Sequence, residues 1–174
     1  MLDMEHVVYS LETVSGVMAT ARAGGLGGFV RVPELAKGYV SRVLDAGATG
    51  VMVPMIESVE QARKLAAWSK FAPVGQRGLG STGVHTAYGS ADAVPFMEQS
   101  NREVLTIAQI ETGPAIEAID EIAKVDGIDA MLIGPNDLAI SLGVPGQTTS
   151  GPVAEAIGKV ADACKASGKI FGMH

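Results

Sequence analysis

Cysteine, aromatic residues and charge are all scarce in this sequence. Cys164 is the single cysteine among 174 residues, so no disulfide can form within the chain, and we expect a reducing, cytoplasmic location. Aromatic residues make up 5% of the chain and charged residues 18%, whereas 47% of residues are hydrophobic. This composition excludes an intrinsically disordered protein and predicts a single packed domain over residues 1–174.

Membrane-spanning segments, basic clusters and nucleotide-binding loops are also lacking. No apolar run reaches the roughly 20 residues that a transmembrane helix needs, and the opening residues MLDMEH carry acids where a secretory signal carries bases. The formal net charge is −6 and no Lys/Arg cluster stands out, so we expect neither a membrane nor a nucleic acid as partner. No G-x-G-x-x-G or Walker-type motif opens a helix after a strand, which argues against a nucleotide-binding sheet.

The chain does contain a regular alternation of apolar strands and amphipathic helices. The strands are continuously apolar, which is typical of a parallel sheet buried on both faces. We expect strands at residues 1–4, 29–32, 50–55, 104–110, 128–133 and 169–173, and a short one near Leu79. We expect helices at residues 11–23, 34–46, 58–70, 91–100, 136–142 and 152–167, and one that begins near Pro114. Residues 73–90 are rich in glycine and predict a long, functional loop.

This order of strands and helices fits either an open doubly wound sheet or a (β/α)8 barrel. In a barrel the carboxyl ends of the strands converge on one site, whereas in an open sheet they would spread along a line. Polar residues follow the ends of successive strands, namely Glu5 and His6, Arg31, Glu57, Gln109 and Glu111, and Asn136 and Asp137. We therefore predict an α/β fold of the (β/α)8 barrel type, with its site at these strand ends.

Two acids, Glu111 and Asp137, follow neighbouring strands and stand where the next helices begin. Carboxylate oxygens are the ligands that hard divalent cations prefer, and water and a chelating substrate would complete an octahedron. The alternative is simple capping, because negative charge is favoured at helix N-termini in any case. The spacing alone leaves both interpretations open.

Three further side chains stand at equivalent strand ends. His6 follows Asp3 and Glu5, and an acid nearby can hold an imidazole in one tautomer for use as a general base; a surface or partly buried histidine is the alternative. Arg31 interrupts the apolar segment FVRV, and an unpaired buried guanidinium would be very costly, so it should pair with an acid or an anionic ligand. Gln109 shares a strand face with Glu111 because side chains alternate with a period of two. His85, in the long loop, is a weaker candidate for contact with substrate.

Six segments, in order, resemble the HpcH/HpaI aldolase/citrate lyase family. They are D-M-E-H (3–6), V-R-V-P (30–33), L-D-A-G (44–47) with V-P-M-I-E (53–57), G-Q-R-G-L-G-S (75–81), Q-I-E-T (109–112) and G-P-N-D-L (134–138). Each motif alone is weak evidence for the family, but the six motifs in this order are specific for it. Within the family the sequence is most similar to the divalent-metal-dependent 2-oxo acid aldolases. The resemblance implies a barrel enzyme that reversibly cleaves a 4-hydroxy-2-oxo acid to pyruvate and an aldehyde through a stabilised enolate.

The resemblance also implies a metal site and a pyruvate site. Glu111 and Asp137 match the carboxylates that bind the cation, which would be Mg²⁺, Mn²⁺ or Co²⁺, and Gln109 matches the glutamine beside them. Arg31 matches the arginine that contacts the oxo group of pyruvate and its enolate. The backbone from Gly134 through Pro135 to Asn136 matches the segment that holds the pyruvate carboxylate.

The remaining roles concern the proton and the aldehyde. The resemblance implies that His6, with Asp3 behind it, is the catalytic base. Ser81, beside Gly80, matches the loop near the aldehyde. Asp45 matches an acid that, in hexameric relatives, approaches the site of a neighbouring subunit, so the resemblance implies a homo-oligomer.

The length of the chain departs from this pattern. A complete barrel typically needs about 250 residues, and by resemblance the 174 residues cover only about strands 2 to 7, as if truncated at both ends. Two other functions stay open at this point. One is a related carbon–carbon lyase or decarboxylase that acts on an acyl-CoA or on oxaloacetate. The other is a truncated, inactive barrel.

Overall fold

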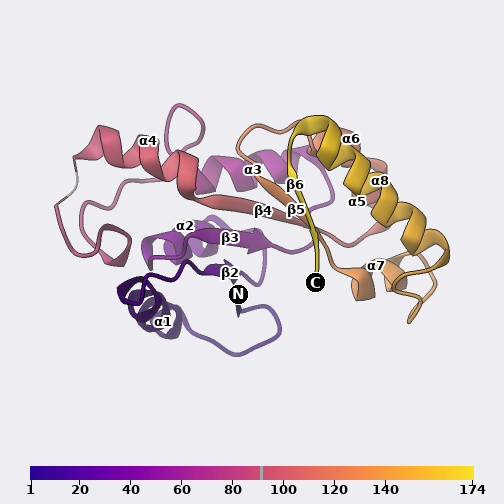
Figure 1. The fold of residues 1–174 in the computed structure, drawn as a ribbon, viewed down its shortest axis with the longest axis horizontal. Helices are drawn as coiled ribbons and strands as arrows, with labels where there is room; N and C mark the ends of the chain where they lie inside the picture. The colour runs from indigo at the N-terminus through magenta and orange to yellow at the C-terminus, as the bar shows by residue number, and fades with distance from the viewer. Residues whose placement is uncertain (91) are drawn as a thin grey trace.

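The computed structural model describes residues 1–90 and 92–174, which form one parallel sheet with helices between successive strands (Figure 1). The strands are β1 (Leu2–Asp3), β2 (Phe29–Arg31), β3 (Gly50–Val53), β4 (Leu105–Ile110), β5 (Ala130–Ile133) and β6 (Ile170–Met173). They lie in the sheet in chain order, and every neighbouring pair is parallel. A doubly wound sheet reverses its strand order at a switch point. This unreversed order is that of an incomplete (β/α)8 barrel, which confirms the predicted fold.

Helices cover the outside of the sheet. They are α1 (Leu11–Ala23), α2 (Lys37–Asp45), α3 (Val59–Ser69), α4 (Ala93–Glu103), α5 (Gly113–Glu117), α6 (Ile119–Ile122), α7 (Pro135–Ser141), α8 (Gly151–Ser167) and the short 3-10 helix η1 (Val84–Thr86). Hydroxyl caps start several of them; Ser58 Oγ, for example, accepts a hydrogen bond from the backbone N–H of Gln61 at 3.3 Å. Helix α8 packs on β5 and β6, while α4 extends beyond the strands (Figure 1). Within the described ranges no helix has the length and apolarity needed to cross a bilayer.

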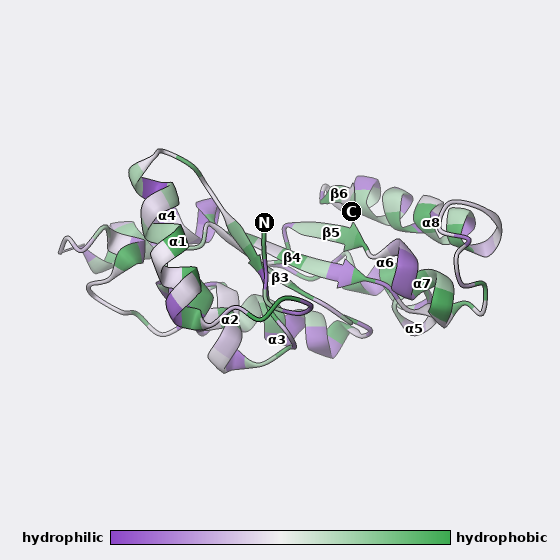
Figure 2. Ribbon diagram, turned by 90° about the horizontal axis from the view of Figure 1, so that it is seen from below, coloured by the Kyte–Doolittle hydropathy of each residue, from purple (hydrophilic) through white to green (hydrophobic). Residues whose placement is uncertain are grey.

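The two faces of the sheet bury different residues because side chains alternate along a strand. The larger core lies between sheet and helices and includes the strand residues Val30, Val51, Val53, Ala108, Ile110, Met131 and Ile133. The other face, the barrel interior, holds a small apolar layer of Met52, Ile107 and Ala130. Gln109 and Glu111 continue the face of Ile107, so the alternation that builds this layer also carries both polar side chains into the interior. Figure 2 shows a hydrophilic stretch near the end of β4, beside the hydrophobic β5.

The structure differs from the sequence prediction in two segments. No strand forms near Leu79, because the loop is tied to α3 instead: the N–H of Gln76 donates to Ala67 O at 2.6 Å, and the N–H of Arg77 donates to Lys70 O at 2.9 Å. The helix predicted from residue 34 begins only at Lys37, after Ala36, whose backbone is extended. Residue 91, which the prediction placed in a helix, lies outside the described residues.

Candidate active site

Glu111 is a carboxylate buried at the carboxyl end of β4, where it is only 1% exposed. Both of its oxygens are held. Oε1 accepts a hydrogen bond from the N–H of Met55 at 2.8 Å, and Oε2 accepts one from Nε2 of Gln109. Gly134, just after β5, lies so close that a Cβ there would collide with Oε2 of Glu111. These neighbours fix the carboxylate in place, but neither donor is a cation that could neutralise its charge.

The Met55 donor depends on an uncommon backbone conformation. Met55 has a φ of 56°, in the left-handed region that residues other than glycine rarely adopt. Such strain costs on the order of 1–3 kcal/mol and is typical of functional sites. The strained turn directs the N–H of Met55 towards Glu111. Sequence reasoning missed this contact, because a backbone donor carries no residue-type signal.

Asp137 lies at the end of the neighbouring strand. Strands β4 and β5 pair Ile110 with Ile133, and α7 begins at Pro135, which places Asp137 in its first turn with an exposed side chain. In the part of the chain that the structure describes, no group of three or more His, Cys, Asp or Glu side chains is arranged to hold a metal. The structure thus brings two carboxylates to adjacent strand ends. A cation held by them would take its other ligands from water or substrate.

Arg31 is a buried guanidinium at the end of β2, 7% exposed. Its Nε donates to Asp3 Oδ1 at 2.8 Å, its Nη2 donates to Asp3 Oδ2 at 2.5 Å, and its Nη1 lies 3.2 Å from Glu5 Oε2. The hydrogen bonds to Asp3 raise the pKa of Arg31 and lower the pKa of Asp3 to about 2. The prediction that Arg31 pairs with an acid is confirmed, and the register that aligns Asp3 with Arg31 explains which acid it is.

The structure does not show the predicted pair of Asp3 and His6. Both oxygens of Asp3 bind Arg31, and Oδ1 also accepts the N–H of Glu5 at 3.0 Å. The acid that faces His6 is Glu5, whose Oε2 lies 3.7 Å from Nε2 of the imidazole. The imidazole itself is 63% exposed. Glu5 is one of the two acids, with Asp3, that precede His6 in the sequence, and it lies in the bend that follows β1.

The charges at this edge of the sheet fit a divalent cation. Asp3, Glu5 and Glu111 all raise the pKa of Arg31, Asp3 most strongly, so three carboxylates lie around one guanidinium. Burial raises the pKa of Glu5, and the negative charge of Glu111 adds to this effect. Gln109 Oε1 is a buried acceptor oxygen without a hydrogen-bond donor, and Glu5 Oε2, also buried, has no hydrogen bond besides its ion-pair contacts with Arg31 and His6. Excess negative charge and free oxygen acceptors are what a hard cation stabilises.

The residues predicted to bind substrate fall into two groups. Gly134, Pro135 and Asn136 form the turn between β5 and α7, at the same edge as Glu111. Asp45 and Ser81 lie elsewhere in this chain. Asp45 ends α2, on the side where β3 begins, and forms an ion pair with Arg77 at 2.7 Å. Its role was predicted for a neighbouring subunit, which a single chain leaves untested.

His85 is held by the chain itself. Its Nδ1 lies 2.9 Å from Asp45 O and its Nε2 lies 2.9 Å from Gly80 O. The ring also packs against Phe96, with centroids 5.7 Å apart. With both nitrogens in contact with backbone carbonyls, the structure gives His85 a role in shaping the loop, and within this chain it lies apart from Glu111.

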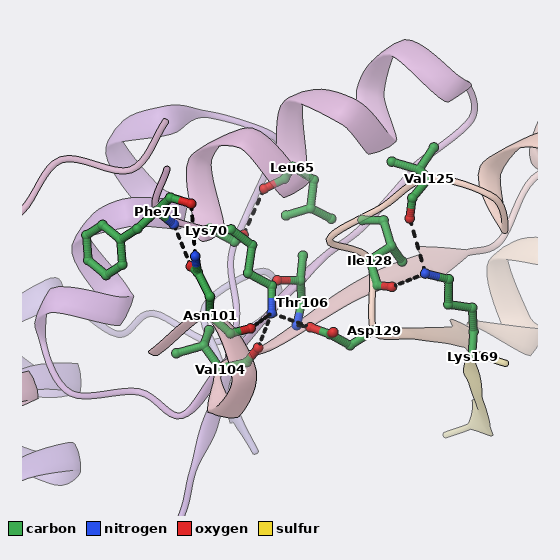
Figure 3. Close-up of polar contacts among 11 residues, drawn as sticks. Leu65, Lys70, Phe71, Asn101, Val104, Thr106, Val125, Ile128, Asp129 and Lys169 are labelled. Atoms are coloured by element: carbon green, nitrogen blue, oxygen red, sulfur yellow. Dashed lines mark hydrogen bonds and ion pairs between the residues drawn. The ribbon is translucent and has the colours of Figure 1, made fainter. Parts of the chain in front are cut away.

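A buried lysine that the sequence prediction overlooked lies at the opposite end of the strands (Figure 3). Lys70 is 2% exposed, and its Nζ donates to Val104 O at 2.6 Å, Asn101 O at 3.1 Å and Asp129 Oδ2 at 2.7 Å. Val104 and Asp129 directly precede β4 and β5. In barrels the amino ends of the strands serve stability, whereas the carboxyl ends carry the chemistry. Lys70 is therefore a structural tie.

Comparison with known proteins agrees with these features. The sequence profile of the HpcH/HpaI aldolase/citrate lyase family matches residues 1–173. A hydroxypyruvate/pyruvate aldolase from Roseovarius nubinhibens is 34% identical over 172 residues, which are 99% of this chain and 66% of that protein. A 4-hydroxy-2-oxovalerate aldolase from Novosphingobium aromaticivorans is 36% identical over 177 residues, covering 99% of this chain and 65% of that protein.

A solved structure of the same family has the same fold. The crystal structure of an HpcH/HpaI aldolase from Desulfitobacterium hafniense DCB-2 superposes with a TM-score of 0.93 at 34% identity, covering 98% of this chain and 66% of that chain. The chain thus spans 65–66% of the length of these three proteins. The profile matches residues 1–173, a range that contains the strand ends with Arg31 and Glu111. The chain belongs to the HpcH/HpaI aldolase/citrate lyase family.

Proposed function

We propose that this chain carries the active site of a divalent-metal-dependent aldolase. It would reversibly cleave a 4-hydroxy-2-oxo acid to pyruvate and an aldehyde. The observation that carries the proposal is the buried carboxylate of Glu111, whose two hydrogen-bond donors are uncharged, beside the Asp3–Arg31–Glu5 cluster, at the strand ends where barrel enzymes hold their substrates. The names of the two aldolases that match 99% of the chain support the same reaction.

Glu111 and Asp137 would hold the cation, and their oxygens suit Mg²⁺, Mn²⁺ or Co²⁺. When bound, the cation would act as a Lewis acid that stabilises negative charge developing on the keto oxygen. Gln109 keeps Glu111 in position through its Nε2 donor. Gly134 leaves room for the carboxylate, and the turn of Gly134, Pro135 and Asn136 would hold the carboxylate of pyruvate.

Arg31 is the side chain that would place a positive charge beside the substrate, in addition to the cation. A guanidinium has five N–H donors, and Asp3 takes two of them through Nε and Nη2. The donors that remain on Nη1 and Nη2 would bind the oxo group of the substrate. Because Arg31 is buried and held before substrate arrives, it can stabilise charge without a reorganisation cost in the transition state.

His6 would act as the base. Its exposed imidazole would take the proton of the C4 hydroxyl as the C3–C4 bond breaks. The electron pair of that bond goes to C3 and forms the enolate of pyruvate, and the aldehyde leaves with its carbonyl at C4. In the direction of synthesis the same imidazolium returns the proton to the new hydroxyl. General bases of this kind contribute about 100- to 10,000-fold to the rate.

Substrate range and assembly belong to the same proposal. Pyruvate and a short aldehyde are the small-molecule partners, and neither a nucleic acid nor a membrane is needed. A homo-oligomer, hexameric by resemblance, would bring Asp45 of one subunit towards the site of a neighbouring subunit, and Ser81 would belong to the loop near the aldehyde. The cytoplasm stays the predicted location.

The test is release of pyruvate from a 4-hydroxy-2-oxo acid by the 174-residue chain. Pyruvate should form with Mg²⁺, Mn²⁺ or Co²⁺ and should not form after addition of a chelator. Glu111→Gln, which keeps the shape of the side chain, should abolish the reaction. Borohydride together with pyruvate should leave the chain unmodified, because no Schiff base forms. Cleavage that survives both the chelator and Glu111→Gln would contradict the proposal.

A further inference from the structure

Arg77 is a second buried guanidinium, which the proposed reaction does not use. Its side chain is 1% exposed, and its Nη2 donates to Asp45 Oδ1 at 2.7 Å. Its Nε is buried and has no hydrogen-bond partner among the described residues. A guanidinium has five N–H donors, and burial of such a group is costly unless it is paired and hydrogen-bonded. Arg77 therefore has the capacity to bind a second anion.

Asp45 compensates the charge of Arg77 only in part. Burial lowers the pKa of Arg77, and the hydrogen bond and the charge of Asp45 oppose this shift without overcoming it. The carboxylate of Asp45 is itself partly exposed, so solvent screens its charge. The ring of Phe71, whose centroid lies 4.7 Å from the guanidinium carbon, adds a weaker attraction. A carboxylate placed beside Arg77 would stabilise the charged guanidinium.

A cavity of about 300 Å³ lies beside Arg77, at the amino ends of β3 and β4. Thr49 and Val104, which directly precede these two strands, belong to its lining. Pockets for small organic molecules measure about 300–1,000 Å³, so this cavity suits a small ligand. Glu111 follows the other end of β4, and the cavity is therefore separate from the proposed active site.

The lining combines a second arginine with apolar surface. Arg22, in the last turn of α1, is exposed and forms no ion pair within the part of the chain that the structure describes. Its Nη2 donates to His85 O at 3.4 Å, a long hydrogen bond that leaves most of its donors available. Leu44, Phe96 and Val104 supply apolar side chains to the same cavity.

The acids at the cavity favour a ligand with a single negative charge. Glu103 belongs to the lining, and its Oε1 accepts a hydrogen bond from Nε2 of Gln99 at 2.9 Å. Asp45 contacts Arg77 from the other side. Both carboxylates would repel the second charge of a phosphate dianion, whereas one carboxylate can pair with two guanidinium groups. The apolar part of the lining would be wasted on an inorganic ion.

We propose that this cavity binds a small organic monocarboxylate between the guanidinium groups of Arg77 and Arg22. The carboxylate oxygens accept hydrogen bonds from both arginines, and the apolar tail packs against Leu44 and Phe96. Arg77 belongs to the long loop before α4 and Arg22 to α1, so the ligand joins two segments that are distant in the sequence. The proposal does not depend on the proposed function, because it uses no residue of the active site.

Butyrate and its uncharged analogue butyramide are the probes, added to the 174-residue chain in the presence of a chelator. Saturation-transfer NMR should show that butyrate binds, with a Kd at least about tenfold lower than that of butyramide, because the contacts are charge-assisted. Inorganic phosphate at equal concentration should not displace butyrate. Equal binding of butyrate and butyramide would overturn the proposal, and so would displacement by phosphate, which would show a general anion site.

Arg22→Gln shows where butyrate binds. Arg22 is exposed, so this variant should fold, and the Kd for butyrate should rise about fivefold or more through loss of a charged donor. Arg63→Gln is the matched control, because Arg63 is an exposed arginine of α3 outside the cavity. An equal Kd in the two variants would place butyrate elsewhere, for example beside Arg31, and would overturn the proposal.

Arg77→Gln tests the buried arginine itself and should abolish butyrate binding. A variant that unfolds cooperatively on heating and still binds butyrate as the unaltered chain does would contradict the assignment. If Arg77→Gln does not fold, the comparison of Arg22→Gln with Arg63→Gln decides the matter. Loss of pyruvate release in any of these chains would concern the proposed function alone, since butyrate binding is measured without substrate or metal.

Discussion

Gly134 is the residue with the least room at the site, because its α-carbon lies against two polar side chains. A Cβ would collide with Oε2 of Glu111 and lie 3.1 Å from Nε2 of Gln109. We predict that Gly134→Ala costs about 1–3 kcal/mol of stability, as overpacking does, and also weakens Mn²⁺ binding. Denaturant titration and Mn²⁺ titration measure the two effects. Gly16→Ala is the control, since Gly16 lies in α1 with nothing within 4 Å, and alanine should stabilise that helix by up to about 1 kcal/mol.

Asp3 makes stability depend on pH in the acid range. The hydrogen bonds from Arg31 lower its pKa from the ordinary value of 3.8 to about 2. A folded-state pKa below the unfolded one means that the charged form stabilises the fold above about pH 4, and that this contribution is lost as the pH falls towards 2. Asp3→Asn should therefore cost about 1–2 kcal/mol at neutral pH and progressively less in acid. Urea titrations at pH 6 and pH 3 check this, and equal losses at both would contradict it.

At the scale of elements, the register of β1 and β2 decides how the site residues pair. The sequence predicted that Arg31 needs an anionic partner and that His6 has an acid nearby, and both hold. The orienting role that the resemblance gives to Asp3 stays a prediction; in the structure both oxygens of Asp3 bind Arg31, the residue with which the strand register aligns it. The strands themselves followed from continuous apolar runs. The short strand near Leu79 was wrong, because local apolar pattern does not reveal that the loop bonds to the end of α3.

Lys70 ties α3 to the beginnings of β4 and β5. Its Nζ binds Val104 O and Asp129 Oδ2, and breaking a buried ion pair by removal of one partner costs about 3–5 kcal/mol. We predict a loss near the lower end of this range for Lys70→Met, because Asp129 is partly exposed and also accepts the N–H of Thr106.

Lys64→Met tests whether the loss belongs to Lys70 in particular. Lys64 forms an exposed i,i+4 pair with Glu60 on the same helix, and its removal should cost less than about 1 kcal/mol. Chemical denaturation of both variants gives the comparison. Equal stabilities would show that the tie at the start of the strands contributes nothing.

At the scale of the whole molecule, the proposed cation joins the ends of β4 and β5. A ligand that binds only the folded state at 100 times its Kd adds about 2.7 kcal/mol of stability. We predict that Mn²⁺ raises the melting temperature of the unaltered chain and that a chelator reverses the rise. Glu111→Gln should melt at the same temperature with or without Mn²⁺. A rise of equal size in Glu111→Gln would place the cation elsewhere.

The sequence by itself determined the order of the strands, the side of each strand that carries polar residues, and the set of chemical groups at the strand ends. Those properties follow from local periodicity, which each short segment encodes without help from the others. The tertiary structure decided the partners. Asp3 contacts Arg31 because the register of β1 and β2 aligns the two residues, and Glu111 accepts a hydrogen bond from Met55, whose backbone is strained. Contacts of this kind depend on how separate elements pack. The residue types at the site could therefore be predicted from the sequence, whereas the contacts between them could not.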